Sequence, residues 1–510
     1  MQVLKQARDS VHIFVNDLAC RIVAESGIST DRYHLGKLIF RSLNEAPEFI
    51  AQIDGAKGVS ELNNSLLTRT IKCAISLQNI GVKKGDVVIL MAPNHLDLCV
   101  PMYAALYLGV MVAALDSSLG IRELKDYFDV DQPKVVFCQS EKLSAVHEAL
   151  NLANVEANII TFDQGADCQN FKDFIDMCKD DSAIENFKPT DFDPDETVAF
   201  LTTTSGTTGL PKSTILTHKN LAISVPYLWL GFSEYPTPTK LVMIVSPLQW
   251  LSAGFHYLFS PILRYTRLQS SKPLTLEVIC DLINKYKPSY IAISPPLLTS
   301  VIKSRDDTKC DMTCFETILI GGSAVPQDLL DDIKKVTPKT RALAVYGLSE
   351  IGGMAFYDEC PQRGSVGKPI GCFDYRLVDP TTMEDIYDAN VQGELWLRGL
   401  PVSKGYYRNP EATAEAFQGD GWFRTGDIFY RDDHWNFYFV ERMKLLLKYK
   451  NHQISPIELE GVIRQHPAVL DVAVVGIPDP DCGDLPVACV VIKPHHVVTA
   501  QEIKDIVNGT

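Results

Sequence analysis

The chain has 510 residues, a hydrophobic content of 46%, a charged content of 22% and a formal net charge of −15. That length exceeds what one hydrophobic core usually serves, so we expect two or more domains, and the composition is that of an ordinary soluble globular protein. The acidic balance argues against general nucleic-acid binding, which needs a basic face. It still allows phosphate ligands, because local donors can override the mean charge.

The 13 cysteines show no zinc-binding spacing. Cys310 and Cys314 are four positions apart, but no second pair or histidine cluster completes a tetrahedral site. We therefore expect reduced thiols and an intracellular protein. The N-terminal residues carry scattered charges without an apolar centre, so they do not predict a secretory signal.

Helical and strand-like patterns alternate along the first two thirds of the chain. Residues 60–79 and 276–286 place apolar side chains at helical spacing. The uncharged run 98–115 is long enough to cross a membrane, but its Pro101 and Gly109 favour a buried helix in a βαβ unit. Short β-rich runs recur at residues 87–91, 135–137, 197–203, 241–245, 290–294 and 317–320. This alternation predicts an α/β fold with doubly wound, mostly parallel sheets.

The character of the sequence changes after about residue 370. Residues 374–378 and 393–398 read as antiparallel strands. Further on, Ser455, Pro456 and Glu458 have the pattern of a capping box at a helix start, and two strands and a helix from about Thr499 follow. We predict a large domain over residues 1–440, with a small β-rich subdomain at about 370–440, and a small α+β domain over residues 441–510.

Residues 202–213, TTTSGTTGLPKS, concentrate hydroxyl groups, glycines and one lysine. Hydroxyl and backbone N–H groups are donors, so the stretch suits an oxygen-rich anion such as a phosphate chain, although a flexible polar loop is the alternative. Pro211 before Lys212 breaks the Walker pattern, which disfavours a P-loop kinase or ATPase. The stretch follows a strand and precedes a helix expected near Thr217, where open α/β sheets bind ligands.

Seven motifs occur in the order in which they occur in the adenylate-forming enzymes, the family of acyl-CoA synthetases, coumarate–CoA ligases and beetle luciferases. The motifs are TTTSGTTGLPKS (202–213), VYGLSE (345–350), GSVGKP (364–369), GELWLRG (393–399), GYYRNPEAT (405–413), DGWFRTGDI (420–428) and ERMKLLLKYKNHQISPIELE (441–460). The chain resembles the insect luciferase-like acyl-CoA synthetases in particular. Residues before 200 fit the family by general pattern only.

The resemblance implies a nucleotide site. The hydroxyl-rich stretch would hold the β- and γ-phosphates of ATP, Tyr346 would stack on adenine, and Asp427 would accept both ribose hydroxyls. A surface ion pair between Asp427 and Arg442 is the alternative for those two residues. The implied nucleotide-binding residues are Thr204, Ser205, Gly206, Thr207, Thr208, Gly209, Lys212, Gly322, Ser323, Tyr346, Gly347, Ser349, Asp427 and Arg442. The implied substrate-pocket residues are Trp250, Gly321, Ala324 and Gly352.

The resemblance also implies a reaction in two steps. A carboxylate attacks the α-phosphate of ATP to give an acyl-adenylate and pyrophosphate, and the thiol of coenzyme A then displaces AMP. Ser349, Glu350 and Lys448 would be the catalytic residues, with Glu350 as the Mg²⁺ ligand. Lys448 would face the site in the thioester step with Gln453 as its companion, and Glu441 would be the hinge, where aspartate is usual.

The sequence departs from the family pattern at several places. The family's adenylation lysine would lie beyond Thr510, so we expect either a truncated sequence or a product without that lysine. Trp250 stands where a histidine is usual, which predicts a differently shaped acyl pocket. Ser213 and Asn451 each stand where glycine is usual.

Two functions are therefore open. The first is an ATP-, Mg²⁺- and coenzyme A-dependent ligase acting on a medium- or long-chain fatty acid or a related carboxylate. The second is a catalytically impaired protein that binds a nucleotide or acyl-adenylate; an oxidative light-emitting enzyme is disfavoured by Trp250. We expect only small-molecule partners, no nucleic acid and no membrane span. The expected location is the cytoplasm, or the peroxisome for a longer form with a targeting tripeptide.

Overall fold

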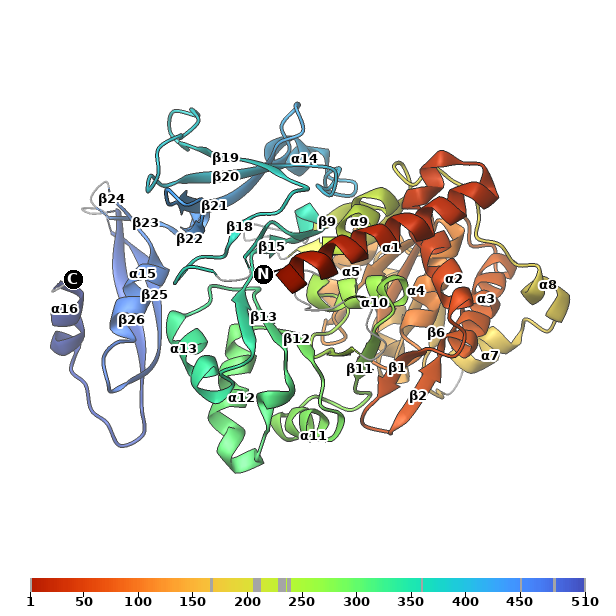
Figure 1. Ribbon diagram of the computed structural model, residues 1–510, viewed down its shortest axis with the longest axis horizontal. Helices are drawn as coiled ribbons and strands as arrows, with labels where there is room; N and C mark the ends of the chain where they lie inside the picture. The colour runs from red at the N-terminus through yellow and green to blue at the C-terminus, as the bar shows by residue number, and fades with distance from the viewer. Residues whose placement is uncertain are drawn as a thin grey trace.

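The structure is a computed structural model that describes residues 2–165, 168–204, 212–227, 235, 240–358, 361–449, 452–479 and 483–508. Within these ranges it describes only the backbone for residues 2–8, 204, 306–308, 448, 452–453, 483 and 508. The chain folds into a large part with two parallel sheets, an antiparallel sheet beside them and a small C-terminal part (Figure 1).

One seven-stranded sheet has the strand order β7-β6-β5-β3-β4-β8-β9. Its strands are parallel except for β9, which pairs antiparallel with β8. Every residue of β3, β4 and β5 is buried, as expected for a parallel sheet covered on both faces. The strands are β3 (Val87–Met91), β4 (Met111–Ala114), β5 (Val135–Cys138), β6 (Asn158–Thr161), β7 (Gln169–Asn170), β8 (Val198–Thr204) and β9 (Lys212–Thr217).

The second seven-stranded sheet has the order β14-β13-β12-β10-β11-β1-β2, and only β2 runs antiparallel to its neighbour. Its strands are β1 (Ile50–Asp54), β2 (Val59–Leu62), β10 (Leu241–Met243), β11 (Thr266–Gln269), β12 (Tyr290–Ile293), β13 (Thr317–Ile320) and β14 (Arg341–Ala344). The largest hydrophobic cluster contains residues of both sheets, such as Leu90 and Val242, so the sheets share a core.

Helices separate and cover these sheets. The run 98–115 forms α4 and β4, as predicted, and every residue of α4 is buried. No helix among the described residues is both long and apolar enough for a membrane span. The helices of this part are α1 (Gln2–Ser26), α2 (Leu35–Glu45), α3 (Asn63–Asn79), α4 (Cys99–Leu108), α5 (Ile121–Asp131), α6 (Leu143–Leu152), α7 (Phe171–Asp176), α8 (Asp181–Glu185), α9 (His218–Ser224), α10 (Leu251–Leu263), α11 (Leu276–Tyr286), α12 (Pro295–Thr308) and α13 (Gln327–Val336).

An antiparallel sheet of four strands in chain order follows, at the top of Figure 1. It confirms the predicted antiparallel pairing of residues 374–378 with 393–398. Its strands are β19 (Asp374–Val378), β20 (Gly393–Arg398), β21 (Phe423–Arg431) and β22 (Phe437–Arg442), with α14 (Pro410–Ala416) between β20 and β21. Two short hairpins precede it: β15 (Gly347–Leu348) with β16 (Gly353–Met354), and β17 (Phe356–Tyr357) with β18 (Lys368–Pro369).

The C-terminal part has its own hydrophobic cluster, which includes Ile463, Val472 and Ile503. Its antiparallel sheet has the order β24-β23-β26-β25. Its elements are β23 (Leu447–Tyr449), β24 (His452–Ile454), α15 (Pro456–Ile463), β25 (Val469–Asp479), β26 (Gly483–Ile492) and α16 (Ala500–Asn508). Ser455 caps α15 as predicted, since its Oγ accepts a hydrogen bond from Glu458 N at 3.3 Å.

The predicted α/β fold, with large parallel-sheet and small C-terminal parts, is confirmed. One local prediction is wrong in part: the helix expected near Thr217 is confirmed, but a strand precedes it. The hydroxyl-rich stretch does not connect a strand directly to a helix, because residues 212–217 form β9 and return along β8. The stretch therefore joins the two strands of a hairpin, and the predicted helix start at Thr217, which caps α9, comes only after β9.

Candidate nucleotide-binding site

Tyr346 and Asp427 meet although they are 81 positions apart. Tyr346 follows β14 at the carboxyl end of its parallel sheet, and Asp427 lies in β21 of the antiparallel sheet. Tyr346 Oη donates a hydrogen bond of 2.6 Å to Asp427 Oδ2. The Tyr346 ring packs edge-on against Phe429, with ring centroids 4.8 Å apart, which fixes its orientation.

Asp427 forms the ion pair with Arg442 that the sequence left open as the alternative, but only Arg442 lies at the surface: 51% of its side chain is exposed, against 2% for Asp427. Its Oδ1 lies 3.4 Å from Arg442 Nε, yet makes no hydrogen bond to the described residues. Burial raises the pKa of Asp427 to about 6, against the opposing effects of the Tyr346 hydrogen bond and the Arg442 charge. Asp427 therefore offers a buried acceptor that suits a ligand hydroxyl.

Glu350 forms the second part of the site, together with Tyr406 and Lys212. Tyr406 Oη donates to Glu350 Oε1 at 2.8 Å, and Lys212 Nζ lies 5.1 Å from the centroid of the Tyr406 ring. Burial raises the pKa of Glu350, while the hydrogen bond from Tyr406 and the charges of Arg442 and Lys212 lower it. Because both cations act on Glu350, the two parts of the site form one electrostatic unit.

No role was predicted for Tyr406 from the sequence. It lies within the quoted motif GYYRNPEAT, so the signal was present, but a motif does not show which of its side chains face inward. Its backbone bridges to Thr214 of β9, which brings the motif against the hairpin.

Two of the predicted glycines, Gly321 and Gly347, pack closely against neighbouring backbone. Gly321, directly after β13, packs so closely on Val345 that a Cβ would lie 2.9 Å from the Val345 oxygen. Gly347 tolerates no side chain either, because its Cβ would lie 2.5 Å from the oxygen of Gly353. Gly321 thus lies beside the chain that leads to Tyr346, and the predicted Gly322, Ser323 and Ala324 follow Gly321 in sequence. The predicted Gly347, Ser349 and Gly352 follow Tyr346 within six residues.

Other predicted residues are placed only in part. Ser205, Gly206, Thr207, Thr208 and Gly209 lie outside the described residues, and Thr204 ends β8 opposite Lys212. Lys448 and Gln453 are register partners in the β23–β24 hairpin, where only their backbone is described. Trp250 precedes α10 and is 61% exposed.

Glu441, the predicted hinge residue, is buried at the end of β22. Its Oε1 accepts from Arg442 N at 2.9 Å. Its Oε2 accepts from Ile457 N at 3.2 Å and from Ser455 Oγ at 3.3 Å. The carboxylate therefore ties the antiparallel sheet to the first turn of α15, the junction between the two parts of the chain.

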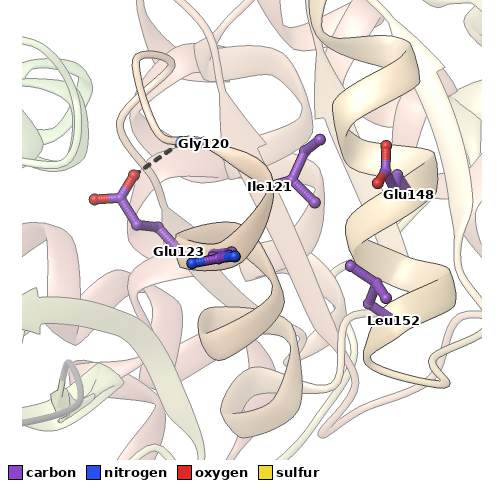
Figure 2. A pocket seen from close by; sticks show the side chains of 6 residues that line it. Gly120, Ile121, Glu123, Glu148 and Leu152 are labelled. Carbon is purple, nitrogen blue, oxygen red and sulfur yellow. Dashed lines mark hydrogen bonds between the residues drawn. The ribbon is translucent and has the colours of Figure 1, made fainter.

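A surface groove between α5 and α6 lies apart from these residues (Figure 2). Glu123, drawn in Figure 2, accepts a hydrogen bond from Gly120 N at 2.9 Å and so caps its own helix. None of the predicted site residues lines this groove; its lining residues are Gly120, Ile121, Arg122, Glu123, Glu148 and Leu152.

Two mainly parallel sheets, an antiparallel sheet with a buried carboxylate and a small C-terminal part are the arrangement expected for the class of adenylate-forming enzymes. The family model described as "AMP-binding enzyme" matches residues 41–407, and the model of its C-terminal domain matches residues 458–510. The chain belongs to the AMP-binding enzyme family. The predicted resemblance is thereby confirmed.

The relatives in this family include luciferases and CoA ligase-like proteins. Luciferin 4-monooxygenase of Photuris pensylvanica is 30% identical over 461 residues, covering 88% of this chain and 83% of that protein. The 4-coumarate–CoA ligase-like 9 protein of Arabidopsis thaliana is 29% identical, covering 89% and 80%. The solved luciferase-like enzyme of the nonluminescent mealworm Zophobas morio is 28% identical, with a TM-score of 0.74 over 80% of this chain and 95% of that structure.

Proposed function

We propose that the protein is an ATP-dependent carboxylate–CoA ligase that forms an acyl-adenylate and then a thioester of coenzyme A, with a medium- or long-chain fatty acid as the carboxylate. The observation that carries the proposal is the buried Asp427, which lies beside the Tyr346 ring and whose Oδ1 accepts no hydrogen bond from the described part of the chain. A ribose hydroxyl would supply a donor while the adenine lies against Tyr346.

The charges near Glu350 support the first chemical step. Lys212 and Arg442 both act electrostatically on Glu350. Two cations beside the bound phosphates would stabilise the charge that develops as pyrophosphate leaves. The reaction needs no protein nucleophile, because the substrate carboxylate attacks the α-phosphate when the two are held in line.

The residues around Glu350 could hold Mg²⁺ only if ATP supplies most of the ligands to the metal. No group of three or more histidine, cysteine or acidic side chains suited to a metal occurs among the described residues. Glu350 would supply one hard oxygen ligand, and the phosphates and water would supply the others, as is usual for Mg²⁺. When bound, Mg²⁺ would neutralise phosphate charge.

The second step would use the C-terminal part. The backbones of Lys448 and Gln453 are register partners across one hairpin, so a movement of this hairpin would carry both residues together. We propose that they serve thioester formation, with Glu441 at the junction about which the C-terminal part moves.

The test is carboxylate-dependent exchange of labelled pyrophosphate into ATP, followed by thioester formation from a supplied acyl-adenylate and coenzyme A. Fatty acids of increasing length are compared with coumarate. We expect exchange with the fatty acids, and a loss of about 100-fold or more in Asp427→Ala. Asp374→Ala, on an exposed position of the same sheet, is the matched control. Binding of AMP without exchange would instead identify a nucleotide-binding protein impaired in the first step.

A further inference from the structure

Helix α5 contacts both strands of the hairpin that carries Lys212. Asp131, the last residue of α5, accepts a hydrogen bond from Ser213 Oγ at 3.0 Å, and both residues are buried. One turn earlier on the same face, the side chain of Tyr127 is hydrogen-bonded to Thr203. Thr203 and Ser213 are register partners in β8 and β9, so α5 holds a matched pair of residues across the hairpin.

Ser213 is also held from another direction. Tyr407 N donates to Ser213 O at 2.7 Å, and Arg408 Nη1 donates to Val130 O at 3.4 Å. The chain that contains Tyr406 thus lies against the same point of β9 and against the end of α5. The hydroxyl of Ser213 matters here, because glycine, expected at this position from the family resemblance, has none.

The pleat of a strand makes these contacts relevant to Lys212. Successive side chains of a strand point to opposite faces, so Ser213 on the α5 side puts Lys212 on the side of Tyr406 and Glu350. A slip of one residue in the pairing of β8 and β9 would turn Lys212 to the wrong face. The bond between Asp131 and Ser213 opposes that slip.

The burial of the Asp131 carboxylate is not explained by a gain in stability. Asp131 is fully buried, and its Oδ2 makes no hydrogen bond to the described residues. Arg408 is the cation whose charge acts on it, but it makes its hydrogen bond to a backbone oxygen rather than to the carboxylate. A buried carboxylate in these surroundings lowers the stability of the fold relative to a neutral residue. We therefore look for its role in the β8–β9 hairpin that it contacts.

We propose that Asp131 is a positioning residue for the triphosphate of ATP: through Ser213 it fixes the register of the β8–β9 hairpin and so directs Lys212 toward the Glu350–Tyr406 pair. This inference rests on the proposed function for its ligand. It predicts a difference between ATP and AMP, because the hairpin would hold the β- and γ-phosphates that ATP carries and AMP lacks. Loss of the Asp131–Ser213 bond weakens ATP binding and spares AMP binding.

The experiment titrates the full chain with ATP and, separately, with AMP by calorimetry. Asp131→Ala and Ser213→Ala are each expected to weaken ATP binding about fivefold or more, with AMP binding changed less than about twofold. The double variant should bind ATP no more weakly than the weaker single variant, because both substitutions remove one bond. Asp131→Asn keeps an oxygen acceptor for Ser213 Oγ and should restore most of the ATP affinity.

Asp129→Asn is the matched control, since Asp129 lies on the exposed side of α5 and pairs with Lys125. It should leave both affinities unchanged. Equal losses of ATP and AMP affinity in Asp131→Ala, or no loss of either, would overturn the proposal.

Amide hydrogen exchange in the nucleotide-free protein keeps the two proposals separable. Exchange over residues 212–217 should accelerate in Asp131→Ala and Ser213→Ala but not in Asp129→Asn. Unchanged exchange refutes the positioning role whatever the nucleotide data show. If the unmodified protein binds neither ATP nor AMP, the proposed function fails, and with it the role of Asp131 toward ATP.

Discussion

The two carboxylate oxygens of Asp427 have different surroundings. Oδ2 accepts from Tyr346 Oη, whereas Oδ1 is buried with Arg442 Nε at 3.4 Å and makes no hydrogen bond to the described residues. A buried acceptor without a donor costs roughly 1–3 kcal/mol, and a ligand hydroxyl removes that cost when it binds. Under the proposed function, Asp427 would therefore lower the stability of the free protein and favour binding of the nucleotide.

The pKa of Asp427 gives the first prediction. Burial raises it from an ordinary 3.8 to about 6, so between these pH values the folded chain keeps a proton that the unfolded chain loses. Stability from this group is therefore complete below about pH 4 and is lost as the pH rises through 6. Asp427→Asn should be more stable than the unmodified protein at pH 8 by about 3 kcal/mol, and the difference should vanish near pH 4. Urea unfolding at both pH values measures it, and a difference independent of pH contradicts it.

Tyr346 allows its ring and its hydroxyl to be tested separately. If the ring stacks on adenine, Tyr346→Phe keeps the stacking and should change AMP affinity only a few-fold. Tyr346→Ala should weaken AMP binding by about 10-fold or more, because base–aromatic stacking contributes roughly 1–3 kcal/mol. Titration with AMP at pH 8 distinguishes the two, and equal losses in both variants would show that the hydroxyl, rather than the ring, is what matters.

At the scale of elements, the hairpin of β8 and β9 shows what the sequence did not predict. Residues 213–217, STILT, show no alternation of polar and apolar side chains and run directly into the cap of α9 at Thr217. So short a run is compatible with a loop as well as with a strand. The pairing that decides between them comes from β8, and from Tyr406 and Tyr407, which are far away in sequence.

The start of α15 gives a second element-scale prediction. Glu441 accepts from Arg442 N, Ser455 Oγ and Ile457 N, and it places a negative charge at a helix N-terminus. Glu441→Ala should lower the free energy of unfolding by about 1–3 kcal/mol and increase protease cleavage between residues 441 and 455. Glu458→Gln, exposed in the same first turn, is the control. Equal effects of the two substitutions would show that Glu441 does not tie the two parts together.

At the scale of the whole molecule, the site is assembled from parts that do not neighbour each other in sequence. Tyr346 comes from one parallel sheet, Lys212 from the other, and Asp427 from the antiparallel sheet. The sequence could predict these residues because each lies in a motif that resembles a family pattern. It could not predict the Glu350–Tyr406 bond or the Asp131–Ser213 bond, since neither partner's direction follows from spacing along the chain.

This assembly predicts how nucleotide affects the stability of the large part of the chain. A nucleotide that contacts all three sheets binds only the folded form, so ATP at 100 times its dissociation constant should stabilise the protein by about 2.7 kcal/mol. Thermal unfolding should shift upward as one transition, because the two parallel sheets share a core. The Tyr346→Ala/Asp427→Ala variant should show no shift at the same ATP concentration, while Asp374→Ala should shift like the unmodified protein. A shift of the same size in the double variant would place the nucleotide elsewhere on the molecule, and the absence of any shift in the unmodified protein would refute nucleotide binding.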